Sequence, residues 1–416
     1  MTDRPPNIVL VVMDDLGYGD LGCTGNTILR TPRIDSLAER GVNLRHTYAA
    51  SSVCSPSRAA LMTGRYPQRV GLPKVLFPHD GTGLSTWEYT LPRMLRDTGY
   101  RTAMFGKWHL GCRPEHHPTR HGFDEYAGLL YSNDMHPVEM FEGDQVTGTD
   151  VDQATLTGAY TDHAIDFVRR HADEPFFVYL AHTMPHIPLA VTDEFRDRSA
   201  GGRYGDVVEC LDHHVGRLLD TLDEVGVADN TLVMVTSDNG PWFEGSTGGL
   251  RGNKNHTYEG GVRVPFLARW PGRIPEGTVS DVPVCLFDLL PTLAALTGGS
   301  LPADRPIDGV DVSAVLTGGS VSRPLFFFHW WTLNAVREGP WKLHLDRQPR
   351  DPTRSHGKEL PQLFNLELDP AETYDLRHGQ PEVVEHLTAL AEDFLAEITA
   401  QRSTAEARAC GRITAS

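Results

Sequence analysis

The sequence predicts an α/β fold, in which helices sandwich a large, mostly parallel sheet and a smaller C-terminal α+β subdomain follows. Two observations predict it. Short apolar runs alternate with helix-like segments from the start of the chain, an order typical of parallel strands joined by crossover helices. After about residue 320 the pattern changes to short, closely spaced strand-like runs. The 416 residues suffice for both parts, and we expect a main domain at residues 1–320 and the subdomain at residues 321–416.

Four apolar runs predict buried strands of the main domain: residues 8–13, 101–105, 176–180 and 232–235. Each run is short and bounded by polar or turn-forming residues, as expected of strands that are covered on both faces.

Helices are predicted between these strands. Thr31-Pro32 opens one helix, with threonine as the N-cap and proline at the first helical position, and Ser55-Pro56 opens another in the same way. Residues 206–225 repeat apolar side chains at helical spacing and predict a long amphipathic helix.

The C-terminal part has a different pattern. Residues 324–331, 335–337 and 341–345 predict short strands joined by hairpins, and residues 381–400 predict a final helix.

Composition excludes several classes of function. The formal net charge of −17 argues against a nucleic-acid partner, which needs a basic face. No apolar run approaches the ~20 residues of a membrane span, and the run at residues 8–13 is too short for a signal-peptide core. The six cysteines have neither zinc spacing nor the density of a disulfide scaffold. We therefore expect a cytoplasmic protein with free thiols and no membrane partner.

Polar side chains follow each of the four predicted strands. The carboxyl ends of parallel strands lie along one edge of a sheet, where ligands bind, so we expect these side chains to converge there. They are Asp14 and Asp15, Lys107 and His109, His182 and His186, and Asp238 and Asn239.

Two of these groups predict a metal site. Asp14, Asp15 and Asp238 offer three carboxylates and Asn239 an amide oxygen, a set that suits Ca²⁺ or, less well, Mg²⁺. Either pair alone is equally well explained as a turn that follows a strand. The presence of both pairs favours the metal.

Cys54 and Arg58 lie at the start of a predicted helix. The helix N-terminus favours negative charge at position 54, as a nucleophile requires, and Arg58 lies one turn further on. The alternative for Cys54 is an inert, partly buried thiol. Lys107 and His109, and Lys254 in a glycine-rich loop, have equally plain alternatives when each is taken alone: exposed lysines and a packing histidine.

Cys54-Ser55-Pro56-Ser57-Arg58 and the residues that follow to Arg65 resemble the signature of type I sulfatases, which belong to the alkaline phosphatase superfamily. In that family the Cys-x-Pro-x-Arg element directs oxidation of the cysteine to formylglycine. Tyr131-Ser132-Asn133-Asp134 resembles the arylsulfatase A-like branch. The resemblance continues in Asp14-Asp15, Gly106-Lys107-Trp108-His109, Pro185-His186-Ile187-Pro188, Ser237-Asp238-Asn239-Gly240, Tyr258-Glu259-Gly260-Gly261 and Leu363-Phe364-Asn365-Leu366.

The resemblance implies an alkaline phosphatase-like fold and hydrolysis of sulfate monoesters to an alcohol and inorganic sulfate. It implies a formylglycine hydrate at position 54 as nucleophile, made from Cys54 by a formylglycine-generating or sulfatase-maturing enzyme. It assigns Ca²⁺ to Asp14, Asp15, Asp238 and Asn239, contacts with residue 54 to Arg58, Lys107 and His109, and the sulfate group to Ser132, His186 and Lys254. His182 stays an outside candidate beside His186.

Under this hypothesis one hydroxyl of the hydrate attacks sulfur, with Asp238 as a candidate base, and the alcohol leaves with a proton from His186 or Lys254. His109 is a candidate base for the step that releases sulfate. The leaving alcohol, a sulfated small molecule or a sugar, depends on three long loops at residues 71–86, 131–149 and 347–358. The alternatives are a phosphate or phosphonate ester hydrolase of the same superfamily and a catalytically silent binding protein, and the oligomeric state, including a homo-oligomer, stays open.

Overall fold

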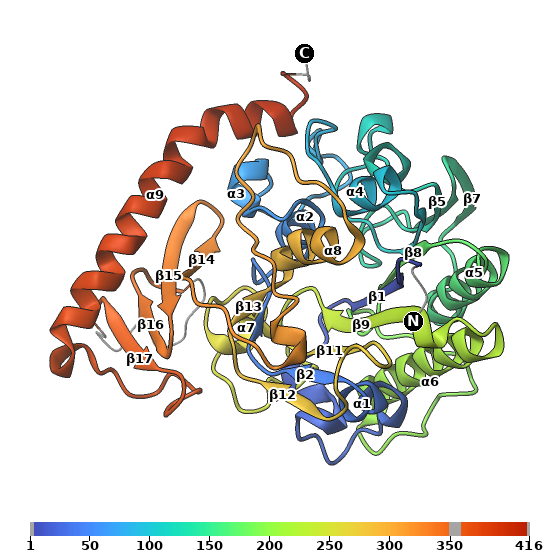
Figure 1. Ribbon diagram of the computed structural model, residues 1–416, viewed down its shortest axis with the longest axis horizontal. Coiled ribbons are helices and arrows are strands. Elements are labelled where there is room, and N and C mark those ends of the chain that lie inside the picture. Colours follow the sequence, from blue (N-terminus) through green and yellow to red (C-terminus); the bar gives the residue numbers. More distant parts are fainter. Residues whose placement is uncertain (1–3, 349–358, 414–416) are drawn as a thin grey trace.

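The computed structural model describes residues 4–348 and 359–413 and confirms a large, mostly parallel sheet between two layers of helices (Figure 1). Five central strands, in the order β9-β1-β8-β4-β5, run parallel, and β11 joins β9 in the antiparallel direction. The ten strands in sheet order are β12 (Thr278–Ser280), β2 (Val42–Leu44), β11 (Phe266–Arg269), β9 (Thr231–Ser237), β1 (Asn7–Met13), β8 (Phe176–His182), β4 (Arg101–Gly106), β5 (Glu125–Gly128), β6 (Glu139–Glu142) and β7 (Gln145–Thr149).

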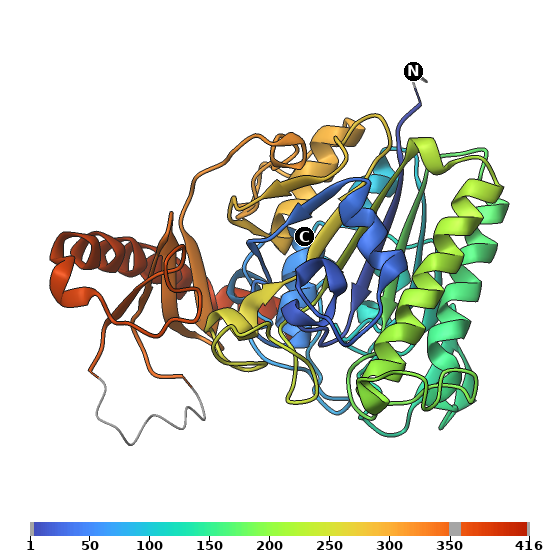
Figure 2. The ribbon, with the colours of Figure 1, turned by 90° about the horizontal axis from the view of Figure 1, so that it is seen from below.

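Helices cover both faces of this sheet, and three very short strands form a second sheet beside it. In Figure 2 the long helices α5 and α6, drawn in green, stand together along one side. The helices of the main domain are α1 (Pro32–Glu39), α2 (Cys54–Thr63), α3 (Pro67–Val70), α4 (Leu91–Asp97), α5 (Leu156–Arg170), α6 (Gly202–Glu224), α7 (Glu259–Val262) and α8 (Leu289–Thr297). The small sheet contains β10 (Arg263–Val264), β3 (Thr47–Tyr48) and β13 (Val284–Cys285).

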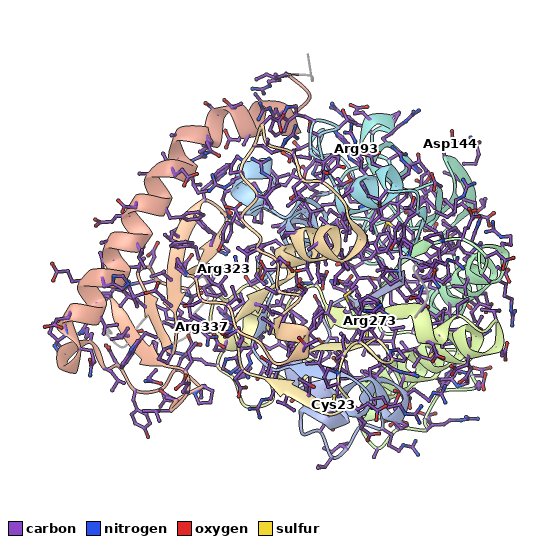
Figure 3. All side chains as sticks on the ribbon, in the orientation of Figure 1. Cys23, Arg93, Asp144, Arg273, Arg323 and Arg337 are labelled. Carbon is purple, nitrogen blue, oxygen red and sulfur yellow. The ribbon has the colours of Figure 1, made fainter. Side chains whose placement is uncertain are left out.

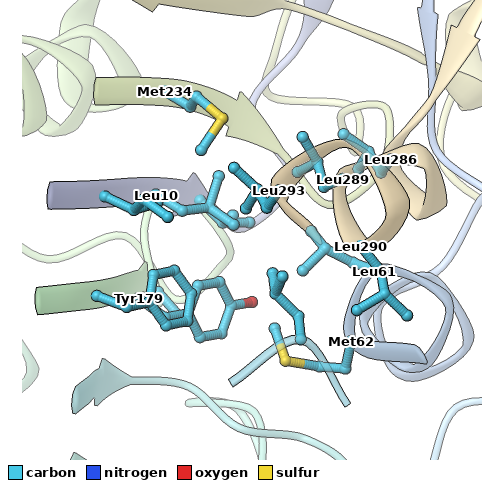
Figure 4. Close-up of a cluster of buried hydrophobic side chains, with 14 of the residues drawn as sticks. Leu10, Leu61, Met62, Tyr179, Met234, Leu286, Leu289, Leu290 and Leu293 are labelled. Carbon is cyan, nitrogen blue, oxygen red and sulfur yellow. The ribbon is translucent and has the colours of Figure 1, made fainter. Parts of the chain in front are cut away.

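Alternate residues of the central strand β1 belong to two separate hydrophobic cores, because successive side chains of a strand point to opposite faces. Ile8, Leu10 and Val12 face α2 and α8, where Leu10 packs among leucines of α8 in Figure 4. Val9 and Val11 face α5 and α6. Each such side chain contributes about 1.5–3 kcal/mol by leaving water, so the two cores hold β1 rigidly in the middle of the molecule.

The helix after position 53 begins earlier than the sequence predicted. Val53 is extended, and α2 starts at Cys54, so the prediction that Ser55 caps this helix and Pro56 begins it is wrong. The Ser55 hydroxyl instead accepts a hydrogen bond of 3.1 Å from the backbone N–H of Leu76. Cys54 itself therefore lies in the first turn, with its backbone fixed by the helix.

The C-terminal unit is a four-stranded antiparallel sheet covered by one long helix, at the left of Figure 1. Its strands are β14 (Leu325–His329), β15 (Thr332–Glu338), β16 (Trp341–His344) and β17 (Gln362–Asn365). Helix α9 (Pro381–Ala409) continues nine residues beyond the predicted end at 400. Of the predicted specificity loop at 347–358, residues 349–358 lie outside the described part of the chain.

Helix α9 packs on both units. Its first half contacts β15, and its second half contacts α3, where Arg69 pairs with Glu397 at 2.8 Å. The domain boundary at residue 320 stays a prediction, because this helix joins the two parts. Among the described residues, no helix combines the length and the apolar character that a membrane span requires.

A buried ion network forms the junction between the two units. The Lys342 ammonium of β16 lies 2.8 Å from Glu259 of α7 and 3.1 Å from Glu372, and all three side chains are fully buried. Arg337, labelled in Figure 3, bonds the Tyr48 hydroxyl of the small sheet, and Tyr48 in turn donates to Glu259 at 2.7 Å. Buried charges are tolerated only when they are paired, so the two units must dock in this register.

Lys342→Met should lower the free energy of unfolding by about 3–5 kcal/mol, because it leaves Glu259 and Glu372 buried with one cation fewer. Chemical denaturation measures this. The control is Arg169→Ala, which breaks an ion pair with Glu224 between two exposed side chains and should cost less than about 1 kcal/mol. Equal effects of the two substitutions would contradict the role of the network.

Candidate active site

Two acidic pairs meet at the carboxyl edge of the large sheet. Strands β1 and β9 are parallel neighbours in which Met13 pairs with Ser237, so the residues that follow each strand lie side by side. The backbone N–H of Asp15 donates to Asp238 at 3.2 Å, and the Asn239 amide donates to Asp15 at 2.7 Å. The register of two buried strands thus brings together two pairs of side chains, and the bonded residues are 223 and 224 positions apart in sequence.

Each carboxylate of this cluster has a buried cation as partner. Lys107 forms a short contact with Asp14, Lys254 lies 2.7 Å from Asp15, and the Arg58 guanidinium lies 2.8 Å from Asp238. Lys107 follows β4, Arg58 lies on α2, and Lys254 lies in the loop before α7. The exposed alternatives for both lysines are wrong, since Lys107 is fully buried and Lys254 nearly so.

Cys54 lies among these groups. Its Sγ is 3.4 Å from an oxygen of Asp14, and it lies within 4.8 Å of ligand atoms of Asp15, His186 and Asp238. Burial raises the pKa of the Cys54 thiol above its ordinary value, and the charge of Asp14 raises it further. Burial and Asp14 thus outweigh the helix N-terminus, and the unmodified thiol is a poor nucleophile.

The carboxylates of the cluster differ in their affinity for protons. Burial alone would raise the pKa of Asp14, but Lys107, with further cations behind it, holds that pKa well below the usual value. Burial and the charge of Asp14 raise the pKa of Asp238 to about 6. The carboxylates of Asp14 and Asp238 thus repel each other and share the same cations. A bound divalent cation would reduce this repulsion.

The amide of Asn239 is suited to such a cation. Its Nδ2 is occupied by Asp15 and by the Gly240 carbonyl, whereas its Oδ1 is buried and accepts no hydrogen bond from any described residue. A buried acceptor without a partner costs free energy unless a ligand satisfies it. Three carboxylates and this amide oxygen form the all-oxygen set that hard divalent cations prefer.

Ser132, His186 and His109 complete the surroundings. The Ser132 hydroxyl accepts from the Lys107 ammonium at 3.0 Å, and the Nε2 of His186 lies 3.6 Å from Asp15. His109 has a positive φ of 59°, and its Nε2 lies 2.9 Å from the carbonyl oxygen of Leu76. Because that carbonyl can only accept, Nε2 carries the proton and the buried Nδ1 retains its lone pair.

His182, the outside candidate, lies elsewhere. Its ring is buried 6.4 Å from that of Tyr160 on α5, and burial, with His214 of α6 nearby, lowers the pKa of His182 to about 3. It belongs to the packing between sheet and helices.

Sequence reasoning missed two groups that hold this site in place. The Ser57 hydroxyl donates to the backbone carbonyl of Asp238, and helical spacing from Cys54 would have indicated that it faces the same way. The Leu76 backbone binds both Ser55 and His109. Backbone groups of a loop carry no sequence signal of this kind.

Comparison with known proteins agrees with this geometry. The sulfatase family profile matches residues 6–300, and the profile of the C-terminal region of aryl-sulfatase matches residues 320–413. The chain belongs to the sulfatase family. It hydrolyses sulfate esters, and the arylsulfatase A-like resemblance and the alkaline phosphatase-like fold are confirmed.

Three relatives illustrate the extent of the similarity. N-acetylgalactosamine-6-sulfatase of Canis lupus familiaris is 36% identical over 92% of this chain and 84% of its own length. Arylsulfatase A of Homo sapiens is 39% identical over 93% of this chain and 87% of its own. The crystal structure of the PsFucS1 sulfatase from Pseudoalteromonas sp. has a TM-score of 0.87 at 27% identity, covering 96% of this chain and 91% of that chain.

Arg58→Ala should reduce kcat/KM for a sulfate ester by a factor on the order of 10²–10³, because it removes a preorganised cation from the site. It should also lower the free energy of unfolding by about 3–5 kcal/mol, since Asp238 is left buried without its partner. Steady-state kinetics and chemical denaturation measure the two effects. Arg58→Lys restores the positive charge but not the planar, two-pronged guanidinium. It should therefore recover more of the free energy of unfolding than of kcat/KM. Unchanged turnover in Arg58→Ala would remove the assigned role.

Proposed function

We propose that this sulfatase acts through a formylglycine hydrate made from Cys54, with Ca²⁺ held by Asp14, Asp15, Asp238 and Asn239. The observation that carries the proposal is the position of Cys54 within reach of three carboxylates and three buried cations. The hydrate would supply an oxygen nucleophile that attacks sulfur and a second hydroxyl that later expels sulfate, and Ca²⁺ would supply positive charge at the sulfate oxygens.

Conversion of Cys54 to formylglycine would supply the nucleophile that the buried thiol does not. The unmodified thiol is held protonated by burial and by Asp14, so the chain presents no strong nucleophile at position 54 without it. Cys54 is only 2% exposed, so a maturing enzyme must act on this segment before it folds.

The net charge of the proposed site depends on the bound cation. In the cluster, Arg58, Lys107 and Lys254 balance the three carboxylates, and a bound divalent cation leaves the site net positive. An acidic protein can thus attract an anionic sulfate to one point, and the same charges stabilise the transition state.

His109 is the base of this proposal. Burial, and the charge of Lys107 after it, lower the pKa of His109 well below its ordinary value, so the ring is neutral at physiological pH. Its proton stays on the nitrogen that bonds Leu76, and the free lone pair on Nδ1 can accept the proton of a reacting hydroxyl.

His186 is the better proton donor to the leaving alcohol. Burial alone would lower the pKa of Lys254, but Asp15 raises it above the ordinary value, so Lys254 holds its charge and does not release a proton readily. His186 shares the Asp15 carboxylate and has its Nδ1 fixed 2.6 Å from the Ile187 carbonyl, which leaves Nε2 directed at the cluster.

N-acetylgalactosamine 6-sulfate and aryl sulfates are candidate substrates, since the relatives named above are called N-acetylgalactosamine-6-sulfatase and arylsulfatase A. Phosphate and phosphonate esters are the rival class. A sulfate monoester carries a single negative charge. Comparing kcat/KM for sulfate, phosphate and phosphonate esters therefore shows which ester the charge of the site favours.

The protein co-produced with a formylglycine-generating enzyme should hydrolyse sulfate esters with a higher kcat/KM than phosphate monoesters or phosphonate esters. Mass spectrometry of the Cys54 peptide should show loss of sulfur, and Cys54→Ala should be inactive. Cys285→Ala, at another buried thiol, is the matched control and should retain activity. Full activity with an unconverted Cys54 would contradict the mechanism.

Removal of divalent ions with a chelator should abolish turnover, and Ca²⁺ should restore it better than Mg²⁺, because carboxylate and amide ligands form an adaptable site. Ca²⁺ at about a hundred times its Kd should add about 2.7 kcal/mol to the free energy of unfolding. The Ca²⁺-dependent rise in Tm should be lost in Asn239→Ala and kept in Asn43→Ala. An equal rise in all three proteins would refute the ligand assignment.

A further inference from the structure

The turn between β14 and β15 carries an exposed tryptophan in a strained backbone position. Trp330 and Trp331 are the two turn residues between the paired His329 and Thr332, and Trp330 has a φ of 57° and is 49% exposed. Positive φ in such a turn favours glycine, and a bulky side chain there is an outlier. Strain of this kind is kept where a side chain has a function.

This turn is tied to the segment that precedes Cys54. Phe328 bridges to Ser51, three residues before Cys54, and the Trp330 carbonyl accepts from Gln68 at 2.6 Å. The backbone N–H of Asn255, next to Lys254, donates to Ser52 at 2.9 Å. The strand that leads into the turn is therefore bridged to the segment before Cys54, and that segment in turn contacts the loop that carries Lys254.

Two further side chains make Trp330 a polar aromatic surface. The ring of His329 stacks on Trp330 with centroids 4.8 Å apart, and the Lys74 ammonium lies 4.3 Å from the centre of the Trp330 ring. Lys74 is two residues before Leu76, whose backbone binds His109 and Ser55. The neighbouring Trp331 instead packs under Arg402 of α9.

Lys74 is an unusual residue in this acidic chain. Of the four lysines in residues 4–348 and 359–413, Lys107, Lys254 and Lys342 are buried in ion pairs, and Lys74 alone is exposed. A single flexible cation beside an anion-binding site, on a protein of net charge −17, suits a second negative group on the same ligand.

We propose that Trp330, His329 and Lys74 form a subsite for the leaving group, and that this group is a sugar bearing a second anionic substituent, a carboxylate or another sulfate. The apolar face of a pyranose would stack on the aromatic surface, and Lys74 would leave the indole to pair with the anion. The inference rests on the proposed catalytic site, because the sulfate ester anchors the sugar there.

The test compares three substrates of the matured enzyme: 4-nitrophenyl sulfate, N-acetylgalactosamine 6-sulfate, and a disaccharide in which a uronic acid is linked to that sulfated sugar. Trp330→Ala should raise KM for both sugars by about tenfold or more, as loss of a central aromatic contact does, and leave kcat/KM for the aryl sulfate within about twofold. Lys74→Gln should raise KM for the disaccharide alone, and Lys74→Arg should restore it. Tyr374→Ala, at a tyrosine of the same unit that is 71% exposed, is the matched control and should change nothing.

Three outcomes would overturn the proposal. Equal losses on aryl and sugar sulfates in Trp330→Ala would indicate an aromatic leaving group or a general disturbance of the site. Unchanged KM for the sugars in Trp330→Ala would remove the subsite, and unchanged disaccharide KM in Lys74→Gln would remove the anionic requirement.

Binding separates this proposal from the catalytic one. Calorimetry of the disaccharide with Cys54→Ala and with the Cys54→Ala/Trp330→Ala double variant reports the subsite without turnover. If no ester is cleaved but the double variant binds at least about tenfold more weakly, the catalytic proposal fails and the subsite stands. If sulfate esters are cleaved and the two affinities agree, the subsite fails alone.

Discussion

Three carboxylates buried at one point are the constraint on which this structure depends. Asp14, Asp15 and Asp238 are withdrawn from water at the ends of two central strands, and an unpaired charge in such a place costs several kcal/mol. Each is paired with a cation from a different element: Lys107 after β4, Lys254 before α7 and Arg58 on α2. The folded structure must therefore bring together five separate segments of the chain.

The C-terminal unit takes part in this assembly through the loop that carries Lys254. Gln348 holds both the backbone N–H and the hydroxyl of Thr257, at 2.8 and 2.7 Å, and Glu372 accepts from the backbone of Glu259 at 2.7 Å. Lys342 then fixes Glu259 and Glu372 from β16. Fixing a loop with several glycines so that the Lys254 ammonium lies 2.7 Å from Asp15 costs conformational entropy. The contacts with Gln348 and Glu372 offset that cost. The C-terminal unit thus supports the loop that carries Lys254, even though it contributes none of the charged groups of the cluster.

Much of this could be predicted from the sequence, because the relevant signals are local. Apolar runs that end in Asp14-Asp15 and Asp238-Asn239 indicate both a parallel sheet and the edge at which it binds a ligand. The start of α2 could not be predicted to the residue. A serine-proline pair opens many helices, but here Ser55-Pro56 lies inside the helix, and the Ser55 hydroxyl binds the Leu76 backbone instead of capping the helix. The residues alone place both His182 and His186 at the end of one predicted strand, and the resemblance favours His186. In the structure His182, the last residue of β8, packs near Tyr160, whereas His186 lies beside Asp15. The strained turn at Trp330 leaves no signal either, since its position depends on how the C-terminal unit docks.

The two units differ in how firmly the side chains near the site are held. In the proposed mechanism the sulfate end of a substrate meets buried charges on elements that pack in two hydrophobic cores, so those charges can change little without loss of the fold. In the proposed subsite the other end meets the half-exposed Trp330 and the exposed Lys74, which lie outside the hydrophobic cores. Substitutions at the turn between β14 and β15 can therefore change which alcohol is accepted while the buried ion pairs keep the reaction the same. The proposal thus places specificity at the tip of an exposed hairpin, whereas the buried ion network around Lys342 keeps the two units docked.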